Sequence, residues 1–129
     1  MLFRSLGLSG SRFFVTDAKT RGELGRIKAV VNLECLAHGE RLELLASDDL
    51  KEHGLRIARD LGLGELPTRP PIAGSDHFPF AVEGIPAACV IRWPYPEYHL
   101  PADRPELADE ALLAPAVELA AQLLEELLV

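Results

Sequence analysis

The chain has 129 residues, 48% of them hydrophobic, and a formal net charge of -7. We interpret it as one domain, residues 1–129, with enough apolar side chains to form a core, and the composition excludes a disordered tail. The acidic charge excludes nucleic-acid binding, because contacts to phosphates need a basic face. No apolar run reaches the ~20 residues of a membrane-spanning helix, so we expect no membrane insertion.

In the first half, hydrophobic spacing predicts a short helix, two strands and a longer helix. The helix covers about residues 8–16, and the strand over 26–35 is apolar on both faces, as in an interior strand. A weakly alternating strand over 41–46 ends at Ser47, a good N-cap for a helix over 48–61. Three prolines make 65–74 a loop with at most a short edge strand.

In the second half, residues 85–93 form another apolar run that predicts an interior strand. A final helix is predicted within 106–128, and Pro115 should kink it or divide it in two. This order of helices and strands predicts an α/β fold, with layers of helix, sheet and helix around a mixed, mostly parallel sheet.

The two cysteines, Cys35 and Cys89, both lie in the apolar strand-like runs. This placement favours buried free thiols over a disulfide, as in a reducing compartment. We therefore expect a cytoplasmic protein.

Histidines and carboxylates gather on the loops that flank the strand over 85–93, where α/β proteins place binding groups. His99 lies on a loop made rigid by neighbouring prolines, and Asp103 is placed to orient its ring. A loop histidine capped by Asp103, without any ligand, is the alternative. Asp76 and His77 stand side by side, an arrangement that fixes a histidine tautomer or forms a capped turn.

Five motifs in order give the chain a resemblance to a known family. They are Gly-Leu-Ser-Gly-Ser at 7–11, Asn-Leu-Glu at 32–34, Ser-Asp-His-x-x-Phe at 75–80, Gly-Ile-Pro-Ala at 84–87 and Tyr-His-x-Pro-x-Asp at 98–103. Together they resemble the di-zinc aminopeptidases, zinc-dependent exopeptidases related to glutamate carboxypeptidase and glutaminyl cyclase. The resemblance covers the C-terminal half of that family's domain, and so implies a truncated version of its fold.

The resemblance implies roles for several residues. His99 occupies the place of a zinc-binding histidine, and Glu34 that of a zinc-binding aspartate, with a side chain one methylene longer. The residues expected to border the substrate pocket are Asp76, His77, Phe78 and Tyr98.

Other family residues have no counterpart here. Two glutamates of the family, the general base and a zinc ligand, align with Arg4 and Ser5, which can play neither role. The family also places a histidine and a bridging aspartate further upstream, and we expect both to be missing. We therefore assign no catalytic residue and expect a weak or incomplete zinc site.

Three interpretations stay open. The chain is a metallopeptidase, a peptide hydrolase, whose missing ligands come from a partner chain; or it is a non-catalytic domain that binds a peptide or a protein; or it is a fragment of a longer aminopeptidase. The two interior-type strands are apolar on both faces, and the chain has few helices to cover them. We therefore also predict a homo-oligomer or a complex with a partner chain.

Overall fold

The computed structural model describes residues 7–128. Its helices and strands, in chain order, are α1 (Ser9–Thr20), β1 (Val30–Glu34), β2 (Arg41–Ala46), α2 (Asp48–Asp60), β3 (Thr68–Arg69), α3 (Phe78–Val82), β4 (Ala87–Trp93) and α4 (Glu110–Leu128). Two short 3-10 helices, Leu24–Arg26 and Pro105–Leu107, lie in the connections. This is the α/β fold that the sequence predicts.

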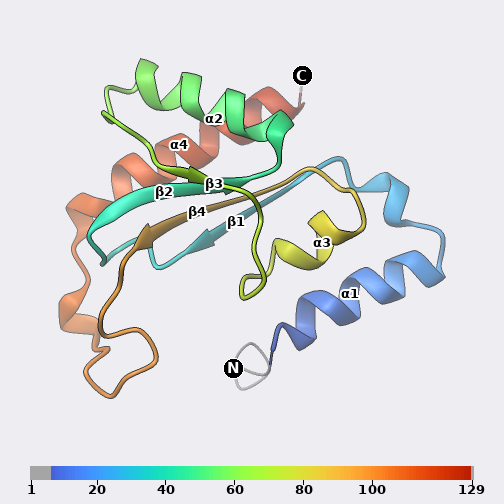
Figure 1. The fold of residues 1–129 in the computed structure, drawn as a ribbon, viewed down its shortest axis with the longest axis horizontal. Coiled ribbons are helices and arrows are strands. Elements are labelled where there is room, and N and C mark those ends of the chain that lie inside the picture. The colour runs from blue at the N-terminus through green and yellow to red at the C-terminus, as the bar shows by residue number, and fades with distance from the viewer. Residues whose placement is uncertain (1–6, 129) are drawn as a thin grey trace.

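The four strands form one mixed sheet in the order β1-β4-β2-β3. The pairings β1–β4 and β2–β3 are parallel, and β2–β4 is antiparallel. The central strand β4 is buried from Ala87 to Arg92, as its apolar run predicts. The parallel β1 and β4 end at the same edge of the sheet, which places the loops after them close together (Figure 1).

Helices α2 and α4 cover one face of the sheet (Figure 1). The apolar faces of both helices pack on side chains of β2 and β4 and form the main hydrophobic core. Four leucines of this core are almost completely buried: Leu44, Leu50, Leu119 and Leu123. Ser47 precedes α2 as predicted, but its Oγ accepts a hydrogen bond from the backbone N–H of Ala87, 3.2 Å away, and does not cap the helix.

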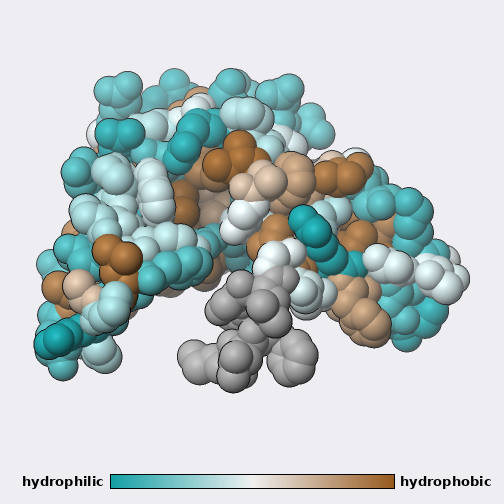
Figure 2. Space-filling view, turned by 60° about the horizontal axis from the view of Figure 1, so that its bottom comes forward, coloured by the Kyte–Doolittle hydropathy of each residue, from teal (hydrophilic) through white to brown (hydrophobic). Residues whose placement is uncertain are grey.

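Helices α3 and α1 lie on the other side of the sheet (Figure 1). Helix α3 contacts β4, and α1 contacts α3. This side leaves hydrophobic surface exposed among polar residues (Figure 2). Its exposed side chains include Phe13, Phe14 and Val82.

Two predictions about these elements were wrong in part, and one helix was not predicted. The run over 26–35 forms an edge strand, because β1 pairs only with β4 among the described strands, and Leu33 is 50% exposed. Of the two outcomes predicted for Pro115, a kink or a division of the last helix, the division does not occur, since Pro115 lies in the second turn of a continuous α4. Helix α3 was not predicted, because Pro79 and the surrounding loop residues are typical of a turn.

Within residues 7–128, no helix is both long enough and apolar enough to cross a lipid bilayer.

Candidate functional site

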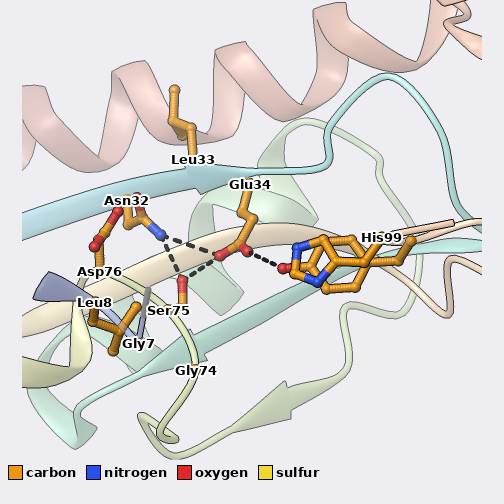
Figure 3. Close-up of a pocket in the computed structure, with 10 residues that line it drawn as sticks. Gly7, Leu8, Asn32, Leu33, Glu34, Gly74, Ser75, Asp76 and His99 are labelled. Atoms are coloured by element: carbon orange, nitrogen blue, oxygen red, sulfur yellow. Dashed lines mark hydrogen bonds between the residues drawn. The ribbon is translucent and has the colours of Figure 1, made fainter. Parts of the chain in front are cut away.

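Four segments that are distant in the sequence meet around one cavity of about 370 Å³. They are the start of α1, the end of β1, the loop before α3 and the loop after β4 (Figure 3). The cavity is lined by Gly7, Leu8, Asn32, Leu33, Glu34, Gly74, Ser75, Asp76, Tyr98 and His99. Two parallel strands that end at the same edge of the sheet produce this convergence.

Glu34 is the centre of a hydrogen-bond network in this cavity (Figure 3). Ser75 Oγ donates to Glu34 Oε2, and Asn32 Nδ2 donates to Ser75 Oγ over 2.7 Å. Tyr98 Oη donates to the other carboxylate oxygen, Oε1, over 3.3 Å. Both oxygens of Glu34 therefore already accept hydrogen bonds from neighbouring side chains.

The Tyr98 hydroxyl stays protonated in this setting. Burial, and then the negative charge of Glu34, raise the pKa of Tyr98 to about 12. Because the hydroxyl keeps its proton at neutral pH, it remains a donor to the carboxylate. Tyr98 therefore fixes the direction of this hydrogen bond, with the hydroxyl as donor and Glu34 as acceptor.

His99 lines the cavity beside this network. Its ring stacks on the ring of Tyr98, with centroids 3.9 Å apart and planes 20° apart. The backbone of His99 has φ of +62°, a left-handed conformation that non-glycine residues seldom adopt. Such strain persists where the surroundings impose it, and it often marks a functional site.

A buried thiol lies beneath the network. Cys89 Sγ is 3.6 Å from Ser75 Oγ and 3.5 Å from Asn32 Nδ2. Burial raises the pKa of Cys89 to about 11, so the thiol is neutral. Both Cys89 and the half-buried Cys35 are free cysteines, as predicted.

The structure brings together only part of the predicted site. Asp76 and Tyr98 line the cavity with Glu34 and His99. His77 and Phe78 do not line it, because the chain turns into α3 at this point. Phe78 lines a separate hollow beside the start of α2.

His77 is completely buried, and neither ring nitrogen has a hydrogen-bond partner within the described part of the chain. Burial lowers the pKa of His77 below its ordinary value, although Asp76 acts in the opposite direction. His77 is therefore a neutral interior residue of the loop that carries Ser75 and Asp76.

Asp103 also has a different contact from the one predicted. Its carboxylate accepts a hydrogen bond from the hydroxyl of Tyr95, which raises the pKa of Tyr95 to about 12. The rings of Tyr95 and His38 meet edge to face, and His38 pairs with Glu97 at 3.0 Å. Asp103 thus holds the loop after β4 in shape and does not orient the ring of His99.

Sequence reasoning missed the amide of Asn32 and the hydroxyl of Ser75 as partners of Glu34. The period-two geometry of a strand offers one signal, because residues 32 and 34 project from the same face of β1. No local signal connects Ser75 to them, since 41 residues separate Ser75 from Glu34.

These residues do not fit a zinc centre. Zinc sites in proteins use three or four nitrogen, sulfur or oxygen ligands from side chains. The cavity is lined by the imidazole of His99 and the carboxylates of Glu34 and Asp76, and both oxygens of Glu34 already accept hydrogen bonds, from Ser75 and Tyr98. Within residues 7–128 no group of three His, Cys, Asp or Glu side chains could hold a metal ion. Arg4 and Ser5 lie outside the described residues.

Comparison with known proteins agrees with the motifs and the fold. The family model of peptidase family M28 matches residues 5–124. The chain belongs to peptidase family M28. The predicted resemblance is therefore confirmed, and no curated protein matches the sequence closely enough to refine it.

Solved structures of M28-like proteins show the same fold. The zinc aminopeptidase BSAP of Bacillus subtilis is 27% identical, with a TM-score of 0.81, and the match covers 94% of this chain and 33% of that one. An aminopeptidase from Aneurinibacillus sp. strain AM-1 is 25% identical, with a TM-score of 0.75 and coverage of 93% and 30%.

A glutaminyl cyclase from an Acidobacteriales bacterium shares the fold at 20% identity, with a TM-score of 0.76 and coverage of 93% and 45%. The chain thus spans about a third of the length of the M28-like aminopeptidases it matches. Relative to those chains, it is a truncated version of the fold.

Proposed function

We propose that this chain is a zinc-aminopeptidase-like domain of family M28 that does not hydrolyse peptides by itself. The family match and the likeness to zinc aminopeptidases support the general class. The observation that carries the proposal is the donor set of the cavity, where His99 and Glu34 are the two residues at positions that the resemblance assigns to metal ligands. Hydrolysis at a two-zinc centre needs two metals, a bridging carboxylate and an activated water.

Weak zinc binding follows from the same geometry. An imidazole and one carboxylate make an open site, and binding the metal would require Glu34 to lose hydrogen bonds from Ser75 or Tyr98. A longer glutamate in place of the family's aspartate also shifts the carboxylate relative to a fixed metal position.

The test combines activity with metal binding. We expect no turnover of an amino-acid p-nitroanilide with zinc, cobalt or manganese added, and zinc that is lost on dialysis. His99→Ala should abolish the remaining weak zinc binding measured by calorimetry. His53→Ala is the matched control, because His53 is half exposed on α2 and pairs with Glu126, away from the cavity. Turnover that disappears in His99→Ala, or stoichiometric zinc after dialysis, would contradict the proposal.

A second candidate is a peptide-binding domain without catalysis. The cavity is lined by two carboxylates, Glu34 and Asp76, and by the rings of Tyr98 and His99, and its described lining contains no lysine or arginine. Such a lining suits the ammonium group at the amino terminus of a peptide. Binding of a dipeptide in the presence of EDTA, weakened by Asp76→Asn, would favour this candidate. Binding that requires zinc would favour the metallopeptidase-like function.

A further inference from the structure

A second charged cluster lies outside the cavity, at the start of β2. Its centre is Glu43, which is only 2% exposed. Both carboxylate oxygens of Glu43 accept hydrogen bonds from arginines: Arg41 Nε donates to Oε1 over 2.9 Å, and Arg69 Nη2 donates to Oε2 over 2.5 Å. Among the described residues, neither arginine pairs with another carboxylate. Two guanidinium groups against one carboxylate therefore leave one positive charge unbalanced.

The two arginines of this cluster are held in place and still have donors to spare. Each guanidinium carries five N–H donors and gives one of them to Glu43. The side chain of Arg41 is 59% exposed and that of Arg69 is 43% exposed, so both can be reached from solvent. A pair of guanidinium groups fixed in this way fits a carboxylate, whose oxygens match their geometry.

The strand register places this cluster in line with Glu34 of the cavity. Glu34 of β1 is paired with Ile91 of β4, and Ile91 is paired with Glu43 of β2. Leu44 packs under the helices, so its neighbour Glu43 projects from the opposite face of the sheet, and Glu34 likewise projects opposite to Leu33 (Figure 3). Two strand spacings of about 4.8 Å place Glu43 roughly 10 Å from Glu34 on the same face.

Aromatic rings lie between the two charged ends. Tyr98 Oη donates to Glu34, and the ring of Tyr98 meets the ring of Trp93 edge to face, with centroids 5.6 Å apart. Trp93 is in turn paired in register with Arg41. Both rings are half-buried and so present part of their surface to solvent. A carboxylate and a pair of guanidinium groups are thus joined by an aromatic surface that crosses β1, β4 and β2.

We propose that this surface binds a peptide of three residues with both ends free, its ammonium group at Glu34 and its terminal carboxylate at Arg41 and Arg69. The proposal rests on the second candidate function, the peptide-binding domain, and adds the length of the ligand and its free carboxyl end. An extended chain spans about 3.3–3.6 Å per residue, so three residues span the roughly 10 Å between the charged ends. A segment inside a longer chain has neither terminal charge, so it would leave both ends of the surface without a partner.

Calorimetry of the full chain with tri-alanine, in the presence of EDTA, tests the proposal. We expect the free acid to bind about tenfold more tightly than tri-alanine amide, because the amide lacks the charged partner of the arginines. Di-alanine and penta-alanine should bind more weakly than tri-alanine, because their charged ends do not match the spacing.

Variants assign the carboxylate to the arginine pair. Arg41→Gln should weaken the free acid about tenfold and leave the amide unchanged. It leaves Arg69 on the buried Glu43, so the fold should persist by circular dichroism. Arg59→Gln is the matched control, because Arg59 is exposed on α2, on the other face of the sheet. Glu43→Gln should tighten the free acid, because it removes the carboxylate that competes for the guanidinium groups.

The outcomes separate this proposal from the peptide-binding function on which it rests. Equal binding of the free acid and the amide, equal effects of Arg41→Gln and Arg59→Gln, or weaker binding of the free acid by Glu43→Gln would each overturn the tripeptide site and leave peptide binding in the cavity intact. A failure of every peptide to bind would overturn both.

Discussion

Replacing Gly54 by alanine measures how closely α2 packs on the sheet. Gly54 lies in the middle of α2, where the helix faces Leu44 of β2. A Cβ atom at this position would lie 2.3 Å from Leu44 Cδ2, closer than the 3.0 Å below which something must shift. The Leu44 side chain has no exposed surface, so it has little room to move.

Two opposing effects set the size of the change. Alanine stabilises a helix by about 0.8–1 kcal/mol relative to glycine. Overpacking a well-packed core costs about 1–3 kcal/mol. Because the clash involves a completely buried side chain, we place its cost in the upper half of that range and expect Gly54→Ala to destabilise the protein by about 1–2 kcal/mol.

Urea unfolding at one fixed protein concentration is the assay, because association would shift the midpoint. Gly10→Ala is the control: it lies in α1, its backbone φ is ordinary, and a Cβ there meets no atom within 4 Å. This variant should be stabilised by up to about 1 kcal/mol. In a double variant with Leu44→Ala, Gly54→Ala should lose its cost, since the clashing atoms are gone. A Gly54→Ala protein as stable as Gly10→Ala would refute the reasoning.

Two further predictions concern buried titratable groups. Burial lowers the pKa of His77 from its ordinary 6.5, so the folded protein holds this imidazole neutral. As the pH falls below about 6.5, the unfolded chain binds a proton at His77 and the folded protein does not. The free energy of unfolding should therefore fall with a slope of up to about 1.4 kcal/mol per pH unit. His77→Leu should flatten the pH dependence of the urea midpoint between about pH 5 and 6.5, and equal slopes in both proteins would contradict this. Burial also raises the pKa of Cys89 and Cys35 to about 11 each, so both thiols are protonated at about pH 7.5. A thiol-reactive disulfide should therefore modify neither of them quickly. Fast modification of Cys89 in the folded protein would contradict this and would show that the structure opens around Cys89.

The sequence alone predicts the elements whose type and burial follow from the hydrophobic pattern of their own residues. The run over 85–93 is apolar on both faces, so it is buried only between neighbouring strands and beneath helices, and β4 is indeed the buried central strand. The amphipathic period over 48–61 predicts α2 to within one residue of its end. The motifs at 32–34 and 98–103 indicated the family and two loops that do meet, because parallel strands carry their following loops to one edge of the sheet.

Only the tertiary structure decided which side chains touch and which strand lies at the edge. Nothing local distinguishes the apolar run of β1 from that of β4, since its edge position depends on which strands pair with it. Likewise, His77 is buried while its neighbour Asp76 reaches the cavity, because the chain turns into α3 between them. Glu34 accepts hydrogen bonds from Ser75 and Tyr98, which lie more than 40 residues away in the sequence. Such contacts depend on how the whole chain packs, and local periodicity carries no information about them.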